Sequence, residues 1–142
     1  GLPFWRGQDV PYKIHSGHRR FVTEPKKRIV VRFFRTAAGR EPVKEWLAKL
    51  DADDRRRIGT DIKDVEFSWP IGMPLCRQLV GHKDLWEVRS RLSGSRIARV
   101  IFLIREGQMI LLHGFQKKAQ KTPKGEIETA VARKKEYERH DR

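Results

Sequence analysis

The sequence predicts a single α+β domain in which helices pack on a largely antiparallel sheet. Two observations lead to this fold class. A pair of amphipathic helical segments follows the first predicted strand, and four short β-rich segments then follow one another. Strands that run consecutively, without helices between them, are typical of antiparallel sheets. The expected order is therefore β-α-α-β-β-β-β-α over residues 29–142.

The first strand and the two helices follow from local patterns. Residues 29–35 (IVVRFFR) are rich in β-branched and aromatic side chains, which favour a strand. Residues 41–50 place apolar side chains at helical spacing after Pro42, which suits a first helical position. Asp51 can cap a second helix, and Trp69-Pro70 ends it.

The second half of the chain has the pattern of a β-meander followed by a helix. The four β-rich segments are residues 74–80, 85–92, 96–105 and 108–115. Turn-forming residues separate them: Gly81, Ser93-Gly94-Ser95 and Glu106-Gly107. After Thr122-Pro123 the apolar residues return to helical spacing, at Ile127, Val131 and Tyr137.

The chain is strongly basic. It has 32 Lys and Arg residues against 18 Asp and Glu, a net charge of +14, which favours a polyanionic partner, with nucleic acid the leading candidate. Residues 1–28 have no sustained periodicity, and we expect them to form a flexible basic extension or a leader introduced by cloning. Their seven basic and two acidic residues supply +5 of the +14, which leaves +9 on the domain.

Several function classes lose support from what the sequence lacks. It contains no P-loop, no G-x-G-x-x-G, no H-E-x-x-H and no G-x-S-x-G motif, and its five histidines are scattered, so we expect no cofactor and no metal. The longest apolar run, residues 100–104, is too short to cross a bilayer, so we expect no membrane association. The single cysteine, Cys76, fits a reducing cytoplasm and a buried structural role.

The candidate chemistry lies in a group of cations on and after the meander. Strand alternation puts Glu87, Arg89 and Arg91 on one face and Trp86 and Val88 on the other. The neighbouring basic residues on the later segments are Arg96, Arg99, His113, Lys117 and Lys118. Cleavage of RNA by its own 2′-hydroxyl needs proton-transfer groups and fixed positive charge at the phosphate, which His, Lys and Arg can supply.

Each of these residues also has a structural explanation. Any single Arg or Lys of a basic chain can be a solvated surface residue, and Glu87 can pair with an arginine of its own or the next strand. His113 can be a hydrogen-bonded histidine at a strand end. From the residues alone, nucleic-acid binding is the better supported reading and nuclease activity the weaker one.

Several ordered motifs resemble one known family. They are Glu41-Pro42-Val43 with Trp46-Leu47, Arg57-Ile58-Gly59 and Asp61-Ile62-Lys63, Trp69-Pro70-Ile71-Gly72-Met73-Pro74, Leu85-Trp86-Glu87-Val88-Arg89, and His113-Gly114-Phe115-Gln116-Lys117-Lys118 with Thr122-Pro123. Together they resemble the phage-derived, HigB-like branch of the RelE/ParE toxin superfamily. The resemblance covers roughly residues 29–138 and does not extend to residues 1–28.

The resemblance implies a RelE-like fold and a toxin of a type II toxin–antitoxin pair. Such a toxin is neutralised by a small helix-turn-helix, HigA-like antitoxin and, when free, cleaves mRNA on the ribosome without a metal or cofactor. Mapped by motif, the implied catalytic residues are Arg89, Arg96, His113, Lys117 and Lys118. Further contacts to RNA are expected from Arg91, Arg99 and Lys121.

Two other functions remain open. ParE-like members of the same fold inhibit DNA gyrase by protein–protein contact without nuclease chemistry. A non-catalytic nucleic-acid-binding module is the other alternative, in which residues 41–67 act as a helix-turn-helix with Arg55, Arg56 and Arg57 at the start of its second helix.

Overall fold

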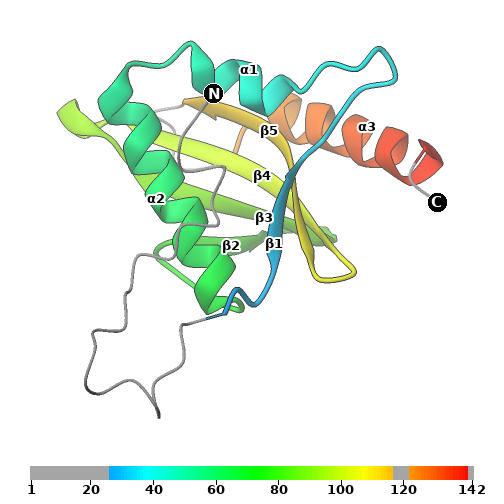
Figure 1. Ribbon diagram of the computed structural model, residues 1–142, viewed down its shortest axis with the longest axis horizontal. Helices are drawn as coiled ribbons and strands as arrows, with labels where there is room; N and C mark the ends of the chain where they lie inside the picture. Colours follow the sequence, from blue (N-terminus) through cyan, green and yellow to red (C-terminus); the bar gives the residue numbers. More distant parts are fainter. Residues whose placement is uncertain (1–25, 117–121, 141–142) are drawn as a thin grey trace, which may run out of the picture.

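The computed structural model describes residues 26–116 and 122–140 of the chain and confirms the α+β class (Figure 1). The predicted order of elements is also confirmed. The elements are β1 (Val30–Phe33), α1 (Pro42–Ala48), α2 (Ala52–Ser68), β2 (Cys76–Leu79), β3 (His82–Arg91), the 3-10 turn η3 (Ser93–Ser95), β4 (Ile97–Arg105), β5 (Gln108–Gln116) and α3 (Lys124–His140).

The five strands form one sheet in the order β1-β5-β4-β3-β2. The meander from β2 to β5 is antiparallel throughout, as predicted, whereas β1 pairs with β5 in parallel. Glu106 and Gly107 close the β4–β5 hairpin with positive φ angles of 52° and 74°, as tight hairpin turns require. The meander brings the end of β3, the start of β4 and the end of β5 to the same end of the sheet.

Helices cover both faces of the sheet, with α1 and α2 on one side and α3 on the other (Figure 1). On the first side, Val43 and Leu47 of α1 and Ile58, Ile62 and Val65 of α2 are fully buried against the sheet. On the second side, Ala130 of α3 is buried, and the predicted apolar stripe of this helix, Ile127, Val131 and Tyr137, packs partly buried beside it. The side chains of β3 alternate between the two faces of the sheet, as in any strand. Trp86 and Val88 are on the face covered by α1 and α2.

Local sequence explains where the first two helices begin. Pro42 is the first residue of α1, where its missing N–H costs nothing. The Asp51 side chain accepts a hydrogen bond of 2.9 Å from the backbone N–H of Asp54 and so caps α2, as predicted. The helix α1 packs closely on β5, because Gly114 lies against Trp46 and a Cβ at that position would come within 2.4 Å of its ring.

The first strand is shorter than expected, and described residues before it already contact α2. β1 spans Val30–Phe33 within the predicted 29–35. The backbone N–H of Arg28 donates to the carbonyl of Glu66, and Lys27 forms an ion pair with the Glu66 carboxylate, so the described part of the predicted extension contacts α2. Glu66 also accepts a hydrogen bond from the backbone N–H of Val31.

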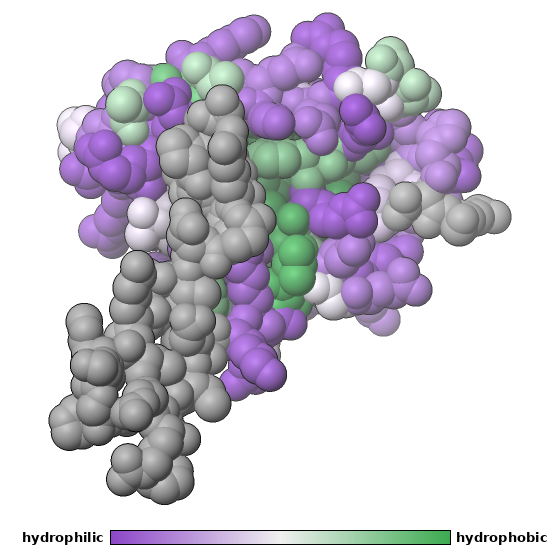
Figure 2. Space-filling model, in the orientation of Figure 1, coloured by the Kyte–Doolittle hydropathy of each residue, from purple (hydrophilic) through white to green (hydrophobic). Residues whose placement is uncertain are grey.

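The visible surface in Figure 2 is mostly hydrophilic, with an apolar band along the position of β1. β1 is an edge strand and contributes the half-exposed Val30. In the part of the chain that the structure describes, no helix has the length and apolar composition needed to span a membrane. Cys76, at the start of β2, is completely buried, as predicted.

Candidate nucleic-acid interface

A groove lined with arginines lies where β3 leaves the sheet, between α2 and the turn that joins β3 to β4. It consists of two adjoining cavities of about 560 and 410 Å³, which share Pro74, Arg89 and Arg91 in their walls. We call this feature the arginine groove and define it by five side chains, Arg56, Arg57, Arg89, Arg91 and Arg96. The sequence predicted three of them, Arg89, Arg91 and Arg96, as site residues.

Arg89 and Arg91 are the arginines of the groove whose charge is left uncompensated. Neither forms an ion pair with any residue among 26–116 or 122–140. The Nε atom of Arg89 is buried, and within the same residues it has no hydrogen-bond partner. A buried donor without a partner costs free energy, so the described residues leave the hydrogen-bonding capacity of Arg89 partly unused.

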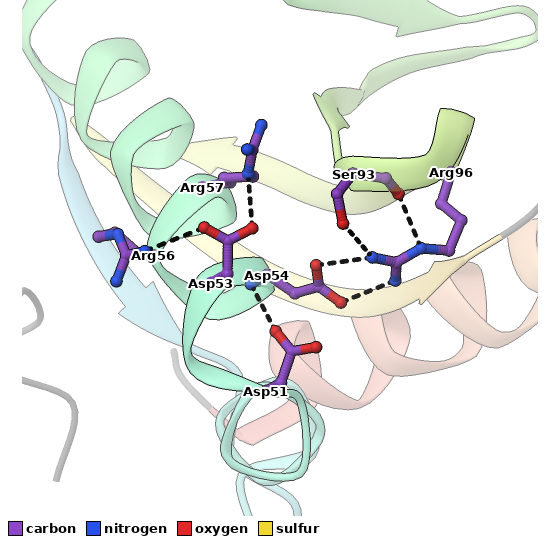
Figure 3. Close-up of polar contacts among 7 residues, drawn as sticks. All are labelled: Asp51, Asp53, Asp54, Arg56, Arg57, Ser93 and Arg96. Carbon is purple, nitrogen blue, oxygen red and sulfur yellow. Dashed lines mark hydrogen bonds and ion pairs between the residues drawn. The ribbon is translucent and has the colours of Figure 1, made fainter.

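Arg96 is held very differently, because all five of its N–H donors have partners within the chain. Nη1 and Nη2 grip the buried carboxylate of Asp54 at 2.7 and 3.0 Å, in the bidentate arrangement shown in Figure 3. The remaining donors bond to the Ser93 carbonyl and hydroxyl, both at 3.0 Å, and to the Gln116 side chain at 3.4 Å. Arg96 therefore fastens the β3–β4 turn to the first turn of α2, and binding a phosphate would cost it one of these contacts.

Arg56 and Arg57 share a single carboxylate. Asp53 bonds to Arg56 Nη2 and to Arg57 Nε, each at 2.9 Å, and all three residues line the groove (Figure 3). The hydrogen bond from Arg57 is the main reason why the pKa of Asp53 lies below its usual range. Arg56 and Arg57 were not among the predicted site residues, although they are adjacent at the start of α2.

A second cationic cluster is buried on the α3 side of the sheet, around the carboxylate of Glu87. Arg77 of β2 donates to Glu87 Oε1 at 3.1 Å, and Arg99 of β4 lies 4.0 Å from Oε2. The hydroxyl of Thr122 donates to Oε2 at 2.5 Å and accepts from both arginines, at 3.1 and 3.3 Å. Arg77 and Thr122 were not among the predicted site residues, although Arg77 stands directly opposite Glu87 in the β2–β3 pair.

The burial of Arg99 is unfavourable for its expected contact with RNA. Its side chain is only 1% exposed, and burial lowers the pKa of Arg99 while the charge of Glu87 opposes this shift. Arg89 and Arg99 face each other across β3 and β4, so Arg89 joins the groove to this cluster. Contact between Arg99 and RNA would require the start of α3 to move.

His113 lies on the same side of the sheet and holds α3 through both ring nitrogens. Nε2 is 2.5 Å from a carboxylate oxygen of Glu126, and Nδ1 is 3.2 Å from Nη1 of Arg133. Because Arg133 can only donate, Nδ1 must accept, and Nε2 carries the proton that is shared with Glu126. The ring also stacks on Phe115, with centroids 5.5 Å apart.

The structure thus brings Arg89, Arg91 and Arg96 together, whereas His113 lies under α3 in other contacts. Lys117, Lys118 and Lys121 lie outside the described residues. They follow β5 directly in the sequence, and its last residue, Gln116, contacts Arg96 at the groove. Within the described ranges, no group of three or more His, Cys, Asp or Glu side chains could hold a metal ion.

Comparison with known proteins identifies the family. A search of curated proteins found no significant match. The model of the phage-derived Gp49-like protein family (DUF891) matches residues 45–135, more than half of the 142-residue chain. This range includes α2, the whole sheet except β1, and all five arginines of the groove. The chain therefore belongs to the phage-derived Gp49-like family, which is part of the RelE/HigB-like group of toxins of toxin–antitoxin systems.

Proposed function

We propose that this toxin is a HigB-like endoribonuclease that blocks translation by cutting mRNA on the ribosome. The observation that carries the proposal is the pair of uncompensated arginines in the groove, Arg89 and Arg91. Arginine binds phosphate through a planar fork of donors and stays charged at any physiological pH. The groove therefore offers fixed positive charge where a polynucleotide backbone can lie, in a domain that is basic overall.

In this proposal the reaction needs no metal and no cofactor. The 2′-oxygen of the substrate attacks the adjacent phosphorus, and negative charge develops on the phosphate oxygens in the transition state. Arg89, whose buried Nε has no partner among the described residues, stabilises this charge, and Arg91 holds the neighbouring phosphate. Because Arg96 is committed to Asp54, it acts by positioning the β3–β4 turn that carries one wall of the groove.

The remaining predicted residues take supporting roles. Lys117 or Lys118 protonates the leaving 5′-oxygen. Both follow Gln116, which contacts Arg96 of the groove, and clustered cations lower a lysine pKa. Lys121 adds a further contact to RNA. His113 anchors α3 through Glu126 and Arg133, and Arg99 lies opposite Arg89 on β4 with its charge paired to Glu87.

The proposal places the protein in the cytoplasm, with the ribosome and mRNA as its targets and a HigA-like helix-turn-helix antitoxin as its inhibitor. The non-catalytic helix-turn-helix alternative loses support, because Ile58, Ile62 and Val65 commit α2 to the sheet. The ParE-like alternative, gyrase inhibition by protein contact, is distinguished by experiment.

The experiment is primer extension on an mRNA from a translation reaction, with and without the protein and with and without ribosomes. We expect discrete breaks that require both the protein and the ribosome. Intact mRNA together with trapped gyrase–DNA complexes in a parallel gyrase assay would refute the proposal and support the ParE-like function.

A further inference from the structure

Asp61 is the carboxylate of the arginine groove that no arginine neutralises. It lies in the middle of α2, two turns beyond Asp53, and lines the larger cavity together with Arg57, Arg89 and Arg91. Asp53 and Asp54, nearer the start of the same helix, are held by Arg56, Arg57 and Arg96. Asp61 forms no ion pair within the described parts of the chain, although four arginines line the same cavity.

The surroundings of Asp61 favour transfer of a proton. The side chain is half-buried between α2 and β3, and this burial is the main reason why the pKa of Asp61 lies above its usual range. The hydroxyl of Ser90 on β3 lowers the pKa of Asp61, and the negative charge of Asp64 adds to the rise caused by burial. A carboxyl whose pKa moves towards neutrality is a better general base at physiological pH than an ordinary surface aspartate.

We propose that Asp61 takes the proton from the attacking 2′-hydroxyl of the RNA. This inference rests on the nuclease function proposed above and assigns the base of that reaction. The proton moves from the 2′-oxygen to the Asp61 carboxylate while the 2′-oxygen forms its bond to phosphorus. The bond between phosphorus and the 5′-oxygen breaks, and this oxygen takes a proton from water. The products are a 2′,3′-cyclic phosphate and a 5′-hydroxyl, and Asp61 returns its proton to solvent.

The arrangement of charges makes this role compatible with the arginines nearby. The charged groups that line the same cavity are Asp53, Arg56 and Arg57 from α2 and Arg89 and Arg91 from β3. Asp53 engages Arg56 and Arg57, and a bound phosphate would engage Arg89 and Arg91. The loop residues that complete the wall, Pro74 and Leu75, are uncharged, so Asp61 faces the substrate without a competing cation.

The test is single-turnover cleavage of mRNA on saturating ribosomes, measured as a function of pH with the full chain. The variant is Asp61→Asn, which keeps the shape of the side chain but cannot accept the proton. The matched control is Asp64→Asn. Asp64 lies one turn further along α2, burial likewise raises its pKa, and it does not line the groove. Circular dichroism establishes that both variants are folded.

We expect the wild-type rate to rise with pH through the pKa of Asp61 and then to level off. Asp61→Asn should lower the saturating rate about 100-fold or more and remove this rise. Asp64→Asn should keep both the saturating rate and the rise, which moves to slightly lower pH because the charge of Asp64 no longer raises the pKa of Asp61. A saturating rate for Asp61→Asn within about twofold of wild type, with the same pH profile, would overturn the assignment.

A second variant covers the case in which Asp61→Asn does not fold. Asp61→Glu keeps a titratable carboxyl but moves it by one methylene, so the rate should fall while the rise with pH persists at a shifted position. A rate and profile identical to wild type would overturn the assignment. Failure of this inference is distinguishable from failure of the proposed function, because in the latter case the wild-type protein itself would not cut mRNA on ribosomes.

Discussion

The contact between Thr122 and Glu87 gives the sharpest test of how α3 is fixed to the sheet. Thr122 directly precedes the start of α3 at Pro123-Lys124, and its buried hydroxyl bridges Glu87, Arg77 and Arg99. Thr122→Val replaces this hydroxyl by a methyl group of similar size, so the packing volume is kept. The change removes the hydroxyl that donates a hydrogen bond of 2.5 Å to the completely buried carboxylate of Glu87.

The expected cost follows from these contacts. A hydrogen bond to a charged group contributes about 1.5–3 kcal/mol, and leaving its buried partner unsatisfied adds to the loss. Arg77 still donates to Glu87, and its partly exposed side chain can gain water in place of Thr122, so this contact adds little. We expect Thr122→Val to lower the free energy of unfolding by about 2–3 kcal/mol. For a domain of this size that corresponds to a fall in Tm of roughly 10 °C.

The assay is thermal and urea unfolding followed by far-ultraviolet circular dichroism. Thr122→Ser, which keeps the hydroxyl, should cost less than about 1 kcal/mol. Thr129→Val is the matched control on α3, because the Thr129 hydroxyl bonds only to the exposed backbone of its own helix. A Thr122→Val variant as stable as wild type would show that the Thr122 hydroxyl does not stabilise the fold through Glu87, as would an equal loss for Thr122→Ser.

Three further predictions concern other parts of the structure. Gly114→Ala should lower the free energy of unfolding by about 1–3 kcal/mol, measured by urea denaturation, because the new methyl group would collide with the ring of Trp46. Cys76 should not react with a thiol reagent at pH 8 until the protein is unfolded, because burial, aided by a nearby carboxylate, raises the pKa of the Cys76 thiol to about 12. Arg96→Ala should lower the Tm by several degrees, whereas Arg91→Ala should leave the Tm nearly unchanged. Of these two arginines, only Arg96 forms an ion pair with a buried carboxylate within the described residues. Equal melting temperatures of the two variants would contradict this.

The sequence predicted the features of this fold that depend on local pattern. The cap at Asp51, the alternation that separates Glu87 from Trp86 and Val88, and the hairpin turn at Glu106-Gly107 each depend on residues close together in the chain. The same applies to the closeness of Arg89 and Arg96, which flank the short β3–β4 turn. These features were correct because short-range periodicity and turn chemistry determine them.

The features that the sequence did not predict depend on contacts between distant segments. The parallel pairing of β1 with β5 joins residues about 78 positions apart, and no local pattern selects that partner. The grip of Arg96 on Asp54 spans 42 positions. The burial of Arg99 depends on how α3 closes over Glu87 and Thr122, which strand alternation alone cannot indicate. The partners of His113 on α3 likewise depend on how that helix packs against the sheet.

We propose that the uncompensated charge in the arginine groove stabilises the cleavage transition state. The most direct test is the rate of single-turnover mRNA cleavage by Arg89→Ala on saturating ribosomes. Arg32→Ala is the matched control, because it removes the same charge from the exposed edge strand β1 at the opposite side of the sheet. We predict that Arg89→Ala folds normally and loses about 100-fold or more of the saturating rate, while Arg32→Ala cleaves like wild type. A folded Arg89→Ala variant that cleaves within a few-fold of wild type would contradict the account.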